Sequence, residues 1–177
     1  MSHSQYQLTL NQPKLMIMKK NIFLLISSLF VFSSCNFSKG VKKDLSTGLS
    51  ASYNGFSIED IYLSSEEKRL SNNSVTMGSK IYITATGVEN FIVKDDKVYP
   101  GCTIILTDKA GKEILNLPDA FSDLVNGTTT TEAKTLQASL TTGNPMAVGE
   151  TYHLYVRFYD KNKKESEIVA NVDLKMK

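Results

Sequence analysis

The sequence contains no tryptophan, and its 177 residues include only two cysteines and two histidines. Zinc sites are built mainly from cysteine and histidine side chains, so this scarcity argues against a zinc site. The chain also lacks a glycine-rich phosphate-binding loop, which argues against nucleotide binding through that motif. The absence of tryptophan weakens a carbohydrate-binding interpretation, because flat aromatic rings stack on sugars. We therefore expect no metal and no cofactor.

Long hydrophobic runs are missing as well. The main apolar stretch is 22–32, which has 11 residues, whereas a membrane-spanning helix needs about 20. A short cationic segment, Met18-Lys19-Lys20-Asn21, precedes this stretch, and Ser33-Ser34-Cys35 follows it. A cationic start, an apolar middle and a small-residue end are the three parts of an export signal. The sequence therefore predicts a cleaved signal over 18–34 and no permanent transmembrane helix.

The end of this signal resembles a lipobox, in which small residues precede a cysteine that receives a diacylglycerol. Ser33, Ser34 and Cys35 match that pattern, while Phe32 stands where leucine or valine is commoner. A lipobox with this departure, in a signal rich in serine and phenylalanine, resembles the loose lipoboxes of Bacteroidetes lipoproteins. The resemblance implies lipidation of Cys35, and the alternative is an incidental cysteine after an ordinary signal. Two or three lipid chains would anchor the protein to a membrane stably.

The flanks of the signal complete the predicted organisation. Residues 1–17 are polar and unpatterned, which indicates a mis-assigned translation start and removes His3 from functional arguments. Residues 35–47, with few large apolar side chains, are predicted to be the lipidated cysteine and a flexible tether. Some surface-exported Bacteroidetes lipoproteins carry an acidic cluster after the cysteine, and residues 36–40 carry none. This favours the periplasmic side of the outer membrane over the cell surface.

Basic residues are not in excess after the signal. Lys14, Lys19 and Lys20 precede Cys35, so 17 of the 20 basic residues remain beside all 18 acidic ones, a net charge of about −1. Nucleic-acid binding requires a clustered basic face. We therefore expect no nucleic-acid partner.

Apolar and polar residues alternate with a period of two over 48–177, which predicts an all-β domain. Turn-forming residues at 54–55, 108–111 and 160–164 indicate hairpin-like connections. The only predicted helical piece is a short turn at 118–125. Seven to nine short strands at this spacing predict an antiparallel β-sandwich. The clearest strands are 136–140, 152–159 and 168–176, and the others are 49–53, 56–63, 80–86, 102–107 and 113–117.

One strand of this domain resembles the penultimate strand of immunoglobulin-like domains. In Gly149-Glu150-Thr151-Tyr152-His153-Leu154-Tyr155-Val156, a glycine and a tyrosine precede alternating apolar residues. The chain lacks the usual single-residue gap between that glycine and tyrosine, and it has neither the cysteine pair nor the tryptophan of true immunoglobulin domains. The resemblance implies an immunoglobulin-like sandwich without fixing its topology, and it leads to no family of known activity.

Residue patterns that support catalysis are scarce, so we expect no catalytic residues. A serine or cysteine hydrolase needs a base beside its nucleophile, and His153, the one histidine after the signal, lies in a strand without a nucleophile motif. Cys102 has no disulfide partner once Cys35 is lipidated and is predicted to be a small core residue. Three lysines within 160–165 oppose a calcium loop. The adjacent acids at 66–67 and 95–96 are predicted to be solvated surface residues.

The remaining prediction is a candidate binding face on the strand 152–159. Opposite its apolar side, this strand carries His153, Tyr155, Arg157 and Tyr159 at two-residue spacing. Tyrosine and arginine dominate binding hot spots, and such a row could stack on a sugar ring or a peptide side chain. The competing interpretation is cross-strand packing that merely covers the sheet.

Two classes of function follow from these observations. The favoured class is a non-catalytic binding or assembly module, anchored in the envelope by its N-terminal lipid, with an envelope protein or a glycan as partner. The alternative is a carbohydrate-binding accessory protein, or a small hydrolase whose site the sequence does not show.

Overall fold

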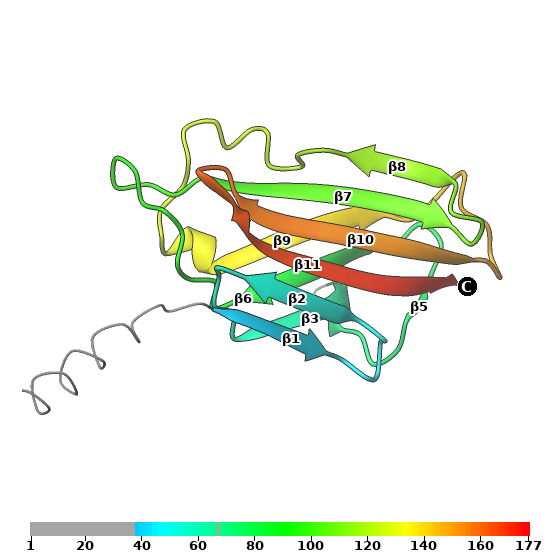
Figure 1. Ribbon diagram of the computed structural model, residues 1–177. Coiled ribbons are helices and arrows are strands. Elements are labelled where there is room, and N and C mark those ends of the chain that lie inside the picture. Colours follow the sequence, from blue (N-terminus) through cyan, green and yellow to red (C-terminus); the bar gives the residue numbers. More distant parts are fainter. Residues whose placement is uncertain (1–37, 67) are drawn as a thin grey trace, which may run out of the picture. The chain divides into compact units, whose positions relative to one another are not determined.

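The computed structural model describes residues 38–66 and 68–177, which form the β-rich domain shown in Figure 1. The expected mis-assigned start, the signal over 18–34, Cys35 and Glu67 lie outside the described residues. None of the described residues belongs to a helix long and apolar enough to cross a membrane.

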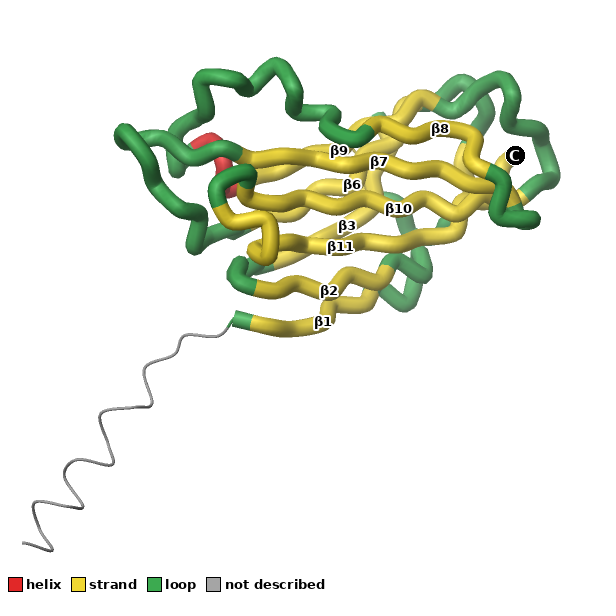
Figure 2. The backbone as a smooth tube through the Cα atoms, turned by 45° about the horizontal axis from the view of Figure 1, so that its top comes forward, coloured by secondary structure: helices red, strands yellow, loops and turns green. Residues whose placement is uncertain are grey.

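Two sheets form the layers of an open sandwich (Figure 2). Every strand pair is antiparallel except the short parallel contact between β5 and β11. The all-β sandwich expected from the sequence is therefore confirmed. The larger sheet has the order β1 (Lys39–Lys43), β2 (Ser50–Asn54), β11 (Lys163–Met176), β10 (Thr151–Asp160), β7 (Pro100–Asp108), β8 (Glu113–Leu117), with β5 (Ser74–Val75) beside β11. The smaller sheet has the order β4 (Lys68–Arg69), β3 (Asp60–Ser65), β6 (Lys80–Thr86), β9 (Thr135–Thr141).

The core lies between the two sheets and follows from the alternation in the sequence. In β10 every second side chain from Tyr152 to Phe158 is buried, and the inward side chains of β6, β7, β9 and β11 meet them. The predicted core is confirmed, since each of its members is at most 2% exposed: Ile104, Leu106, Leu154, Val156, Val172 and Leu174. Cys102 is also fully buried, as expected. Burial, together with the negative charge of Asp119, raises the pKa of its thiol to about 12.

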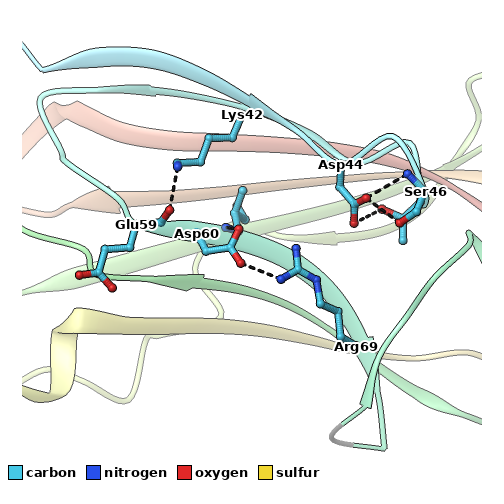
Figure 3. A network of polar contacts seen from close by, with 8 residues as sticks. Lys42, Asp44, Ser46, Glu59, Asp60 and Arg69 are labelled. Carbon is cyan, nitrogen blue, oxygen red and sulfur yellow. Dashed lines mark hydrogen bonds and ion pairs between the residues drawn. The ribbon is translucent and has the colours of Figure 1, made fainter.

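The first strand begins earlier than the sequence predicted. Residues up to 47 were expected to be tether, but β1 pairs with β2 from Lys39↔Asn54 to Lys43↔Ser50. The carboxylate of Asp44 accepts hydrogen bonds from Ser46 and Thr47 and so holds the β1–β2 turn (Figure 3). The error has a physical reason, because an edge strand can be rich in lysine and needs little apolar alternation.

Two further local expectations were wrong. Asn54-Gly55 does not form a hairpin, because β2 belongs to the larger sheet and β3 to the smaller one, so this turn crosses between layers. Residues 118–125 form separate turns rather than a helical piece. The single 3₁₀ turn among the described residues comes later, at Glu132–Lys134. It is favoured there because Glu132 and Thr129 exchange side-chain to backbone hydrogen bonds, as in a capping box.

The two lateral edges of the sandwich differ. At the β1 edge, Nζ of Lys42 donates to the carbonyl oxygen of Glu59, just before β3, at 2.7 Å and thereby bridges the two sheets (Figure 3). At the other edge lie β8 and β9, each of which pairs on one side only within the part of the chain that the structure describes. Leu117 pairs with the buried Ile104 and faces the smaller sheet, yet it is 40% exposed. The smaller sheet therefore ends before it covers β8.

Candidate binding face

Strand β10 presents the four predicted side chains on the outer face of the larger sheet. The neighbouring strands β11 and β7 determine which side chains lie beside these four residues, because directly paired residues of adjacent strands point to the same face. On β11 the partners are Asp173, Asn171, Val169 and Glu167, in the order of His153, Tyr155, Arg157 and Tyr159. On β7 they are Thr107, Ile105, Thr103 and Gly101. The structure thus brings the predicted residues together on one surface.

At the Tyr159 end of this surface, the side chains pack closely against the sheet and against one another. Tyr159 is only 9% exposed, and its ring covers Gly101 so closely that a Cβ there would lie 2.3 Å from Cζ of Tyr159. The guanidinium of Arg157 lies 4.7 Å from the centre of that ring. Nε of Arg157 donates to Glu167 at 2.5 Å, and Nη2 donates to the carbonyl oxygen of Lys164 at 2.8 Å. Burial, and secondarily the charge of Asp119, raises the pKa of Tyr159. Cross-strand packing therefore describes this end best.

At the His153 end the surface is open. The side chains of His153 and Asp173 are 48% and 65% exposed, and Nδ1 of His153 lies 2.9 Å from Oδ1 of Asp173. Nε2 lies 3.3 Å from Oδ1 of Asn171, so oxygen atoms face both ring nitrogens. The amide of Asn73 donates to the backbone oxygen of Asp173 at 2.9 Å and fixes the adjoining loop. These side chains form a polar rim that a ligand can reach.

A shallow hollow of about 280 Å³ lies at this end. It is formed by residues of β2 and β11, by the β1–β2 turn, by the loop before β5 and by His153 on β10. Its lining consists of Thr47, Gly48, Ser50, Asn73, His153, Asn171, Val172 and Asp173. Hydroxyl, amide, carboxylate and imidazole groups dominate, so the hollow can donate hydrogen bonds to a polar ligand and accept them from it. We name it the His153 hollow.

No protein-family model and no curated protein sequence matches the chain.

Tyr155 stands between the open and the packed ends. It is half-buried, flanked by Asn171 on β11 and Ile105 on β7. Burial raises the pKa of its phenol, while Arg157 acts in the opposite direction. Tyr155 therefore offers the one partly accessible aromatic ring beside the His153 hollow on β10.

The hydrogen-bond partners of the His153 ring are a carboxylate and an amide. Nδ1 of His153 faces Asp173 and Nε2 faces Asn171, whereas a base that activates a nucleophile is hydrogen-bonded to a hydroxyl or thiol. Among residues 38–66 and 68–177, no group of three or more histidine, cysteine or acidic side chains could hold a metal ion.

The other acidic candidates serve local structure. Asp160 is fully buried and accepts hydrogen bonds from the backbone N–H groups of Ile92 and Asn162, at 2.7 and 2.8 Å. It therefore ties the β10–β11 hairpin to a distant loop. Asp95 and Asp96 adopt positive φ angles of 52° and 57° in an exposed turn, which is the surface role expected from the sequence.

Several lining residues escaped the sequence analysis, above all Asn171 and Asp173. Their outward position could be read from the alternation in β11. Their pairing with Tyr155 and His153 could not, because the β10–β11 register shifts between Tyr159 and Asp160. Asp160 pairs with Lys163 instead of Ser166, a displacement of three residues, and such an irregularity changes which side chains face each other.

Proposed function

We propose that this protein is an envelope lipoprotein, anchored through Cys35 on the periplasmic side of the outer membrane, whose sandwich is a non-catalytic binding module. The signal over 18–34 and the small residues before Cys35 support the anchor. The resemblance of 149–156 to an immunoglobulin-like strand stays a prediction.

The observation that carries the binding proposal is the polar His153 hollow beside the half-buried ring of Tyr155. A hydroxyl-rich ligand such as a glycan segment fits this chemistry, because hydroxyls both donate to carboxylate and amide oxygens and accept from amide N–H groups. An aromatic ring beside such polar groups adds an apolar stacking surface.

Lipidation is tested by metabolic labelling with a fatty-acid analogue. The wild-type chain should be labelled, and Cys35→Ser should lose the label together with its membrane association. Equal labelling of both chains would contradict the anchor.

The binding site is tested on a glycan array with the double variant His153→Ala/Asp173→Ala. We expect at least about tenfold weaker binding, equivalent to about 1.4 kcal/mol, with an unchanged melting temperature. Asn116→Ala is the matched control, because Asn116 is exposed on the same face, on β8. If the double variant binds glycans as strongly as the Asn116→Ala control, the assignment of the site is refuted.

A second candidate function, assembly by strand addition, is favoured by one observation on β9. This seven-residue strand, Thr135–Thr141, has no charged residue and no proline, and within the described residues it pairs only with β6. Regular, uncharged edge strands are templates for a further strand. Ser139→Lys, on the outward side of β9, places a charge on this edge. It should abolish cross-linking of a partner chain to β9 and leave glycan binding unchanged.

A further inference from the structure

The β1 edge combines basic and exposed apolar side chains. Lys39 and Lys43 are exposed on β1, and Lys42 extends to the other sheet. Between them Val41 is 65% exposed, and Leu45 at the tip of the β1–β2 turn is 93% exposed. We name this surface the basic edge: Lys39, Val41, Lys42, Lys43 and Leu45.

The turn holds Leu45 outward rather than leaving it free to fold back. Asp44 accepts hydrogen bonds from the hydroxyls of Ser46 and Thr47, and its N–H donates to the carbonyl oxygen of Leu49 at 2.8 Å. Hydrogen bonding, mainly from Ser46, lowers the pKa of Asp44. Leu45 makes no contribution to the core at this exposure, and a solvated leucine gains by leaving water.

The distance to the proposed anchor is short. Three residues separate Cys35 from Lys39, and an extended chain spans at most about 3.6 Å per residue. The start of β1 therefore lies within about 14 Å of a lipidated Cys35. This step rests on the lipid anchor proposed above.

We propose that the basic edge lies directly on an anionic phospholipid surface, with Lys39 and Lys43 among the headgroups and Leu45 inserted at the interface. Each lysine near an anionic membrane strengthens association about fivefold. Lysines beside exposed apolar side chains are the composition of interfacial membrane contacts. The domain then stands on its β1 edge, and the β8–β9 edge points away from the bilayer.

The test uses the lipidated mature protein in vesicles, with one cysteine introduced for a fluorophore. Leu45→Cys reports on the basic edge, and Val125→Cys is the matched control, because Val125 is 73% exposed in the loop after β8. Cys102 stays unlabelled, since it is buried and its thiol pKa is about 12. Vesicles contain phosphatidylglycerol or phosphatidylcholine alone, and both carry spin-labelled lipid as quencher.

We expect quenching at Leu45→Cys to exceed that at Val125→Cys severalfold, and only with phosphatidylglycerol. Lys39→Glu/Lys43→Glu, which keeps the Lys42 bond between the sheets, should remove this excess. Lys109→Glu/Lys112→Glu, at exposed lysines of the β7–β8 turn, should preserve it. Equal quenching at the two sites, or quenching that ignores lipid charge, would overturn the docking while the anchor stands. Failure of fatty-acid labelling overturns both proposals.

Discussion

Tyr159 and His153 occupy opposite ends of the same outward row of β10, yet one is buried and the other half-exposed. The difference comes from their neighbours. Gly101, opposite Tyr159 on β7, leaves space for the ring to lie flat on the sheet. Thr107 and Asp173 lie opposite His153 and both carry side chains, and Oδ1 of Asp173 lies 2.9 Å from Nδ1 of the imidazole. Alternation in a strand therefore assigns a side chain to a face, whereas its depth depends on the residues across from it.

The largest loss of stability is expected for side chains on the inward row of β10. Leu154 is 2% exposed and packs between the sheets. Leu154→Ala should lower the free energy of unfolding by about 2–5 kcal/mol, because it removes buried methyl groups and leaves a cavity. Chemical denaturation measures this loss, and a change below about 0.5 kcal/mol would contradict the core position.

The second-largest loss of stability is expected at the packed Tyr159 end of the outward row. Tyr159→Ser removes a ring that covers Gly101 and supports Arg157, so we expect a loss of about 3 kcal/mol. Tyr155→Ser, on the same face, should cost about 1 kcal/mol or less, because it removes only cross-strand packing of a half-buried ring. Melting curves of the two variants compare the ends directly, and equal losses would remove the distinction between them.

Acid should weaken the packed end through Asp119, whose carboxylate lies 2.8 Å from Nζ of Lys161. Burial acts to raise the pKa of Asp119, but hydrogen bonds from Lys161 and from the N–H groups of Cys102 and Phe121 outweigh it and lower the pKa. The contribution is thus complete above the unfolded pKa of about 4 and disappears as pH falls through the lower folded value.

Asp119→Asn should therefore reduce stability at neutral pH by about 1–3 kcal/mol and flatten the stability curve below about pH 4. Denaturation at several pH values measures both effects. The same acid slope in the variant as in the wild type would show that other groups control acid unfolding.

The smallest effect is expected at the open end. His153→Ala removes an exposed polar contact with Asp173, and exposed contacts of this kind contribute about 0–1 kcal/mol. The melting temperature should hardly change, while ligand binding at the His153 hollow should weaken. A large loss of stability would mean that this end is as packed as the other.

The layers of the fold could be predicted because burial imposes a period of two on strands such as β10 and β11. The first strand could not, since the lysines of β1 lie at an edge where little has to be buried. Of the site, the row from His153 to Tyr159 was predicted correctly as one face. Its division into an open and a packed end depends on Gly101 and on the shifted β10–β11 register, and neither shows in local sequence.

Cys102 has a consequence for how the protein matures. Its thiol is buried, its pKa is about 12, and no second cysteine lies among residues 38–66 and 68–177. A thiol in this state reacts slowly with disulfides, because the thiolate is the attacking species. Folding of these residues therefore involves no disulfide bond among their own cysteines, and the domain should reach the same state in an oxidising compartment as in a reducing one.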